Sequence, residues 1–235
     1  MKSKVCSVAI LMSVFLSFSC GHTESESFRT LSLNDKDAGI TRKISICCPQ
    51  EFAGDKAGIA VYMFDDELFN LELLAHDIDS LSYLKLIEPI VIANVSPFES
   101  MSWEFFTDKV IPAVTDNAGI EGASLNILVG KASGADLAIG FGMMQSGTVD
   151  ECWCFSPTVT DVGLFESAGC GVPFTIGWNL REDDYHTYSQ YPTLVNSIRK
   201  RGGTVTTAVY NDADDATACE TEFIRLLIER AGVER

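Results

Sequence analysis

The most informative segment of the chain is Leu125-Asn126-Ile127-Leu128-Val129-Gly130-Lys131-Ala132-Ser133-Gly134. Its first five residues are mostly apolar and predict a short strand. Residues 135–144, which follow it, carry almost no charge and predict a helix. The segment between strand and helix begins at Gly130 and ends at Gly134. It is short enough to require a sharp turn. The sequence therefore predicts a strand, a tight turn and a helix at this point.

The spacing of the glycines is that of a nucleophile elbow, G-x-S-x-G, with Ala132 where the serine stands. Since a methyl group cannot attack a carbonyl carbon, the pattern predicts an elbow that has lost its nucleophile. In the alternative register Ser133 is the nucleophile, with His186 or His76 as its base. The first helical residue after an elbow points away from the apex, however, and serine there is typical of a helix N-cap.

Length and charge limit what kind of protein this is. The chain has 235 residues and a formal net charge of -16, from 17 basic and 33 acidic side chains. Its length suits one α/β domain with a single core. Its acidity argues against nucleic acid as a partner, because nucleic acid binds to basic surfaces.

The first twenty residues have the features of an export signal. Lys2 and Lys4 precede an apolar run, 5–18, that is short for a membrane-spanning helix and ends at Ser19-Cys20. The small residue before the cysteine and the polar residues after it resemble the processing site of bacterial lipoproteins. We therefore expect lipidation at Cys20, with the membrane as a partner only through this anchor; the alternatives are a cleaved soluble protein and an uncleaved anchor.

Six cysteines follow the export segment, namely Cys47, Cys48, Cys152, Cys154, Cys170 and Cys219. Their spacing lacks the C-x2-C pattern of a structural zinc site, and the whole chain has three histidines. We expect buried free thiols, and neither a metal ion nor a cofactor.

Strand and helix patterns alternate along the rest of the chain, after a polar tether over residues 21–41. Strands are expected at 43–48, 58–64, 89–95, 124–130, 151–155, 173–179 and 204–210, and helices at 68–86, 103–114, 135–144, 188–201 and 216–231. Ser96 or Ser100 is the expected cap of the second helix. This alternation predicts a mostly parallel sheet with helices on both faces.

The order of these elements resembles the α/β-hydrolase fold and, within it, the esterase family that includes esterase D and the enterochelin esterases. The resemblance covers residues 42–235 and is carried by Cys48-Pro49, Tyr62–Asp65, Phe105–Pro112, Leu128–Ala135 and Phe155-Ser156-Pro157. It implies a catalytic serine, a histidine after the last strand, a carboxylate that orients the histidine, and backbone N–H groups that hold an oxyanion.

Placed on this chain, the resemblance implies a degenerate catalytic triad. The serine position falls on Ala132 and the histidine position on Asp214, while the acid falls on Glu182, Asp183 or Asp184. A carboxylate cannot replace the imidazole that relays a proton between serine and leaving group at neutral pH.

The resemblance also implies that the oxyanion hole uses the backbone N–H groups of Ser133 and of Asp65 or Asp66. The insertion that usually follows the strand at 89–95 is missing, which implies an altered cleft, and Trp103 is the best-placed aromatic for stacking on a ligand.

These observations predict an exported, lipid-anchored protein with an esterase-like domain that binds a small molecule or saccharide without cleaving it. The alternatives are an active carboxylic ester hydrolase that uses Ser133, and a structural partner in the cell envelope.

Overall fold

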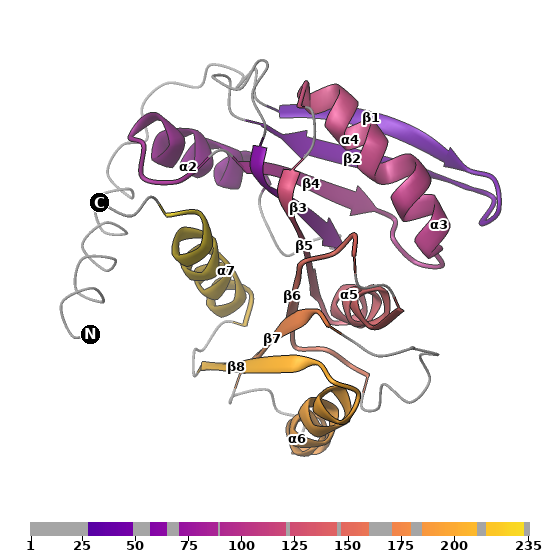
Figure 1. Cartoon of the computed structure of the whole chain (residues 1–235), viewed down its shortest axis with the longest axis vertical. Helices are drawn as coiled ribbons and strands as arrows, with labels where there is room; N and C mark the ends of the chain where they lie inside the picture. Colours follow the sequence, from indigo (N-terminus) through magenta and orange to yellow (C-terminus); the bar gives the residue numbers. More distant parts are fainter. Residues whose placement is uncertain are drawn as a thin grey trace.

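In the computed structural model, eight strands form one sheet in the order β1-β2-β4-β3-β5-β6-β7-β8 (Figure 1). The structure describes residues 28–48, 57–64, 71–88, 90–120, 123–144, 147–159, 171–179, 185–210 and 215–232. The strands are β1 (Phe28–Asp35), β2 (Ile40–Cys47), β3 (Ala57–Phe64), β4 (Ile90–Ser96), β5 (Ala123–Lys131), β6 (Glu151–Phe155), β7 (Pro173–Asn179) and β8 (Thr204–Tyr210). β1 pairs with β2, and β2 with β4, in antiparallel fashion; every other neighbouring pair is parallel. The predicted mostly parallel sheet is confirmed.

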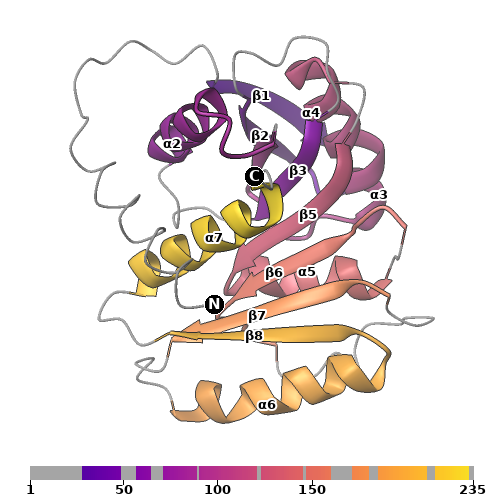
Figure 2. The ribbon, with the colours of Figure 1, turned by 60° about the vertical axis from the view of Figure 1, so that its left-hand side comes forward.

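Helices cover both faces of the sheet, as predicted (Figure 2). One face carries α3 (Trp103–Phe105), η2 (Phe106–Val110), α4 (Ile111–Ala118), α5 (Ser133–Met144) and α6 (Tyr185–Lys200). The other face carries α2 (Leu71–Tyr83) and α7 (Asp215–Ala231). The sheet thus separates two hydrophobic clusters, and β4 is buried on both sides because its Ile90-Val91-Ile92-Ala93 run is apolar throughout.

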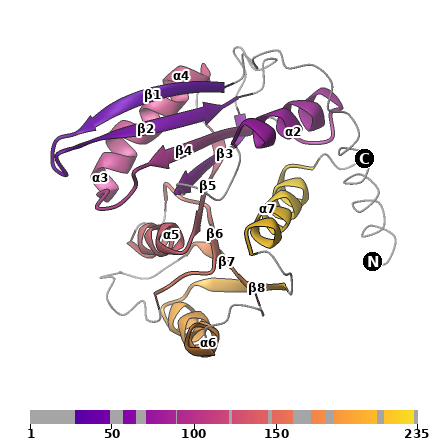
Figure 3. The ribbon, with the colours of Figure 1, turned by 180° about the vertical axis from the view of Figure 1, so that it is seen from behind.

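The predicted tether is wrong for residues 28–41. This segment forms β1, the turn after it and the start of β2, and the hairpin makes up one edge of the sheet, where β2 pairs with β4 (Figure 3). Leu31 and Leu33 alternate with polar residues and pack on the core, whereas Ser32 and Asn34 are exposed. An edge strand that packs only two leucines on the core has an otherwise polar sequence, which resembles that of a tether.

The segment 103–118 is one helical stretch with a local widening. Its cap is Ser102, whose Oγ accepts the N–H of Phe105 at 3.1 Å, and not Ser96 or Ser100 as expected. The turn at 106–110 is a π-helix, placed just before Pro112, a residue that has no N–H to donate into a regular α-helix. The stretch ends at Gly119, whose φ of 69° is left-handed.

No helix among the described residues is long and apolar enough to cross a membrane. The export segment and the proposed lipidation site at Cys20 lie outside these residues.

Candidate functional site

The turn between β5 and α5 has an unusual backbone at Ala132. Its φ is 48°, in the left-handed region that non-glycine residues rarely adopt. The Ala132 N–H donates to the carbonyl oxygen of Phe155 at 3.0 Å, and the Ala132 carbonyl accepts the N–H of Asp136 at 3.1 Å. Ala132 therefore occupies the apex of a sharp strand-to-helix turn, held by β6 on one side and by its own helix on the other.

The two glycines of the turn are required by close packing. A β-carbon at residue 130 would lie 2.2 Å from the carbonyl carbon of Gly134. A β-carbon at residue 134 would lie 1.8 Å from the carbonyl oxygen of Phe64, at the end of β3. Both contacts are with backbone atoms that cannot move aside, so these two positions require glycine. The absence of a side chain at residue 134 allows the start of α5 to lie directly against the end of β3.

The apex carries no group that can react, because Ala132 ends in a methyl group. Ser133, the fallback nucleophile, is exposed and is the first residue of α5. Its backbone N–H lies in the first turn of that helix, where N–H groups have no partner within the helix. The site is therefore suited to holding an oxygen atom by its backbone, without offering a nucleophile at the apex.

A second turn of the same kind stands beside the first and was missed by sequence reasoning. Ser156 follows β6 with a φ of 46°, and its N–H donates to the carbonyl oxygen of Gly177 at 2.7 Å. The segment after it is fixed by the Asp136 carboxylate, which accepts the N–H groups of Thr158 at 2.8 Å and Val159 at 2.9 Å. The Ser156-Pro157 pair after a strand was the only available sequence signal. β5 and β6 thus end in two adjacent left-handed turns.

Several predicted site residues fall outside the described part of the chain. These are the oxyanion-hole candidates Asp65 and Asp66, the acids Glu182, Asp183 and Asp184, and Asp214 at the histidine position. Their roles stay predictions.

The structure does not bring Ser133 together with His76. His76 lies on α2, on the opposite face of the sheet from α5, with its ring 69% exposed and 3.8 Å from the Asp77 carboxylate. His186 lies in α6, and its side chain is outside the described residues.

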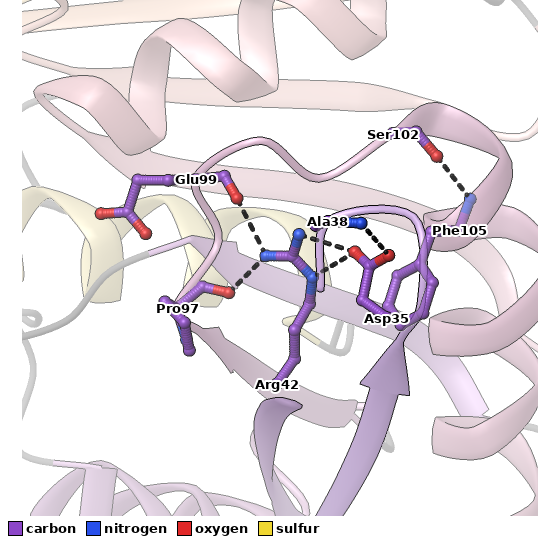
Figure 4. Close-up of polar contacts among 7 residues, drawn as sticks. All are labelled: Asp35, Ala38, Arg42, Pro97, Glu99, Ser102 and Phe105. Atoms are coloured by element: carbon purple, nitrogen blue, oxygen red, sulfur yellow. Dashed lines mark hydrogen bonds and ion pairs between the residues drawn. The ribbon is translucent and has the colours of Figure 1, made fainter. Parts of the chain in front are cut away.

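A buried ion pair holds the loop after β4 (Figure 4). Arg42, which is fully buried, donates through Nε to the Asp35 carboxylate at 2.8 Å. Its Nη1 donates to the carbonyl oxygens of Pro97 at 2.6 Å and Glu99 at 3.1 Å. The guanidinium also lies over the ring of Phe105, 5.5 Å from its centroid. The β1–β2 turn is thereby fastened to the short loop between β4 and α3.

The charge state of Asp35 follows from these contacts. Burial alone raises the pKa of its carboxyl group, but the N–H of Ala38, the hydrogen bond from Arg42 and the Arg42 charge together hold that pKa below its usual value. Asp35 is therefore a carboxylate at neutral pH and neutralises the buried guanidinium.

Aromatic rings connect this loop to the elbow. Phe98 in the loop lies 6.4 Å from Phe64, and Phe64 lies 5.9 Å from Phe141 of α5, measured between ring centroids. Trp103 packs on the ring of Phe141 at 5.3 Å and is partly buried. Part of its surface therefore belongs to the core, and not all of its ring is available to a ligand.

The described cysteines are buried free thiols, namely Cys47, Cys48, Cys152, Cys154 and Cys219. Burial raises the pKa of the Cys47 and Cys154 thiols far above the usual range, which keeps them protonated and unreactive. Among the residues that the structure describes, no group of three or more His, Cys, Asp or Glu side chains is placed to hold a metal ion.

No family model and no curated protein matches the sequence. Solved structures do match. The enterobactin esterase of Shigella flexneri, solved with enterobactin, is similar with a TM-score of 0.71 and 12% identity over 91% of this chain and 61% of that one. A siderophore hydrolase from Aspergillus nidulans has a TM-score of 0.66 and 12% identity over 90% and 98% of the two chains. A ferulic acid esterase has a TM-score of 0.65 and 12% identity over 87% and 97%.

The present chain spans about three fifths of the Shigella flexneri esterase and nearly all of the other two. At these identities the likeness concerns the fold. The chain has the α/β-hydrolase fold of these esterases.

Proposed function

We propose that the protein binds an ester, or the carboxylic acid derived from one, at the turn around Ala132 and does not cleave it. The observation that carries this proposal is the left-handed backbone of an alanine at the apex, with a φ of 48°. This conformation costs an alanine about 1 kcal/mol relative to glycine. A turn that served only to connect β5 to α5 would be more stable with glycine. The presence of alanine at this position therefore supports a binding role for the apex.

The residues that remain are suited to binding rather than to catalysis. The chain's histidines are His22, His76 and His186, so the segment after β8 has none to act as a base. By contrast, the N–H of Ser133 at the start of the 12-residue helix α5 depends on no side chain. Such donors bind carbonyl and carboxylate oxygens, and the helix dipole favours a negative charge there.

The class of ligand is suggested by the similar structures. One was solved with enterobactin and another is named as a ferulic acid esterase. We infer that this chain binds an ester of the siderophore or acylated-saccharide type, or the acid released from it.

A thermal-shift experiment tests the binding proposal with enterobactin, ferulic acid, short carboxylic acids and sugars as probes. A ligand at one hundred times its Kd stabilises the native state by about 2.7 kcal/mol. We expect at least one probe to raise the Tm of the wild type and of Ala132→Gly, which leaves the apex open. Ala132→Asn is the matched control, because asparagine tolerates a left-handed backbone but fills the apex. Binding elsewhere would leave the shift intact in Ala132→Asn, and a panel without any shift would favour a structural role in the cell envelope.

The competing function is ester hydrolysis by Ser133. The placement of His76 on the opposite face of the sheet argues against it, and His186 is the remaining candidate base. The rate of p-nitrophenyl acetate hydrolysis by the wild type and by Ser133→Ala separates the two functions.

We also propose that the chain is exported and lipidated at Cys20, on the strength of the sequence of its first twenty residues. Expression with radiolabelled palmitate should label the wild type and leave Cys20→Ser unlabelled. Equal labelling of both proteins would contradict lipidation at this residue.

A further inference from the structure

A negative charge is fixed beside the apex of the turn at Ala132. Asp136 lies in the first turn of α5, and its N–H donates to the carbonyl oxygen of Ala132 at 3.1 Å. Its carboxylate accepts the N–H groups of Thr158 at 2.8 Å and of Val159 at 2.9 Å, together with the Thr158 hydroxyl. Three hydrogen bonds therefore hold this carboxylate between the turn after β5 and the turn after β6.

This charge changes what the start of α5 can bind. Side chains three residues apart on a helix are neighbours, with about 5–6 Å between their β-carbons, so Asp136 lies beside Ser133. An acidic group in the first turn already compensates the partial positive charge of a helix N-terminus. The Ser133 N–H can still donate a hydrogen bond, but a second negative charge placed there is repelled by the first.

The nearest basic residue in the sequence, Lys131, belongs to the other face of the sheet. Side chains alternate along β5, where Leu128 packs in the cluster under α5 and Val129 packs in the cluster on the opposite face. Lys131 follows the alternation of Val129, and its partner in the β5–β6 register is Phe155, which also packs on the opposite face. Lys131 is therefore not placed to cancel the charge of Asp136.

We propose that Asp136 sets the charge preference of the site at the Ala132 apex. The site accepts an uncharged carbonyl oxygen, such as that of an ester, and rejects the carboxylate of the corresponding acid. This inference rests on the proposed function and narrows it, because it chooses between the two kinds of ligand named there. Like charges about 6 Å apart, partly screened by water, raise a Kd roughly tenfold.

Isothermal titration calorimetry at pH 7 and low salt tests the preference with two matched pairs of probes. The pairs are methyl ferulate with ferulate, and methyl benzoate with benzoate. We expect the wild type to bind the ester of a pair roughly tenfold more tightly than the acid. Asp136→Asn should remove most of this difference, because asparagine has nearly the same size, still accepts one backbone N–H and carries no charge.

Two control variants separate the charge of Asp136 from other effects. Asp116→Asn removes the same charge from an exposed position in α4, which leads to the beginning of β5, and it should keep the wild-type ratio of Kd values. Thr158→Val removes one hydrogen bond of the Asp136 carboxylate but leaves the charge, so it should also keep the ratio. Circular dichroism and Tm show whether each variant is folded.

Added salt gives an independent measurement. Because salt screens the repulsion, the ester preference of the wild type should shrink as salt increases, and the ratio in Asp136→Asn should stay unchanged. The inference is overturned if the wild type binds acid as tightly as ester, if Asp136→Asn keeps the wild-type ratio, or if Thr158→Val lowers the ratio as much as Asp136→Asn does. In each of these cases the proposed function still stands. If the wild type binds no member of either pair, the proposed function is overturned and this inference falls with it.

Discussion

The carbonyl oxygen of Phe64 lies 1.8 Å from the point where a β-carbon on residue 134 would be placed. β3 and the start of α5 therefore approach each other as closely as backbone atoms allow. This contact positions the first turn of α5, and with it the N–H of Ser133, relative to the end of β3.

Gly134→Ala should destabilise the protein by about 3 kcal/mol or more, since overpacking alone costs about 1–3 kcal/mol and here the clash is with backbone. Urea unfolding measures the loss. Gly39→Ala is the matched control: its φ of 69° is also unfavourable for alanine, but nothing lies within 4 Å of the added carbon. The control should lose only about 1–2 kcal/mol. Equal losses in the two variants would show that the contact with Phe64 is not what requires glycine.

Ala132→Gly should stabilise the fold by up to about 1 kcal/mol, because glycine adopts the left-handed backbone of the apex without a steric cost. Ala132→Ser should leave the free energy of unfolding nearly unchanged. Urea unfolding of the three proteins checks both expectations. A destabilised Ala132→Gly would mean that the methyl group makes packing contacts worth more than the strain.

Asp35→Asn should cost about 3–5 kcal/mol at pH 7, because it leaves the buried Arg42 charge without its partner. The folded-state pKa of Asp35 is lowered, so the carboxylate stabilises the fold above its unfolded pKa, near 3.9, and this contribution disappears as the pH falls through the lower, folded value. Unfolding measured from pH 7 downwards should show wild type and variant converging in acid. A difference in the free energy of unfolding that stays constant across this range would contradict the role of the charge. The control Arg42→Lys, which keeps the positive charge, should lose less stability at pH 7 than Asp35→Asn.

Glu220→Gln should stabilise the protein at pH 7 by up to about 0.5 kcal/mol, the size of a surface effect. Burial, and then the nearby Asp77 charge, raise the pKa of Glu220, so the folded state binds its proton more tightly than the unfolded state does. The ionised group therefore weakens the fold at neutral pH, and the penalty is relieved as the pH falls through the raised pKa. Tm values at pH 7 and pH 4 should show the gain of the variant disappearing in acid. Glu229→Gln, which removes an ion pair with Arg225 at 2.6 Å, should give no gain at either pH.

Much of the fold could be predicted because its central strands, such as β4 and β6, are buried on both faces and read as apolar runs. The bounds of β6, β7 and β8 are those expected from the sequence, since each strand is bounded by Gly, Pro or acidic residues. β1 could not be predicted, because a strand covered on one face only, at the edge of the sheet, reads as polar chain. The cap at Ser102 was missed because two other serines stand within six residues of it.

The candidate site was predictable only where it depends on backbone geometry. The spacing of Gly130 and Gly134 predicts the turn at Ala132. The adjacent turn at Ser156 gives almost no signal, because it has neither a glycine nor an unusual neighbour apart from Pro157. The network of Arg42 joins segments 55 residues apart or more, and no local pattern encodes such a contact.

The rate of p-nitrophenyl acetate hydrolysis decides whether the site at the Ala132 apex is catalytic; we expect that it is not. We expect the same rate of hydrolysis for the wild type, Ser133→Ala and Ala132→Ser. This rate should not exceed that of a protein without an active site. Ala132→Ser belongs in the comparison because a serine at the apex still lacks a histidine after β8. Turnover by the wild type that is abolished in Ser133→Ala would contradict the claim and identify the protein as an active esterase.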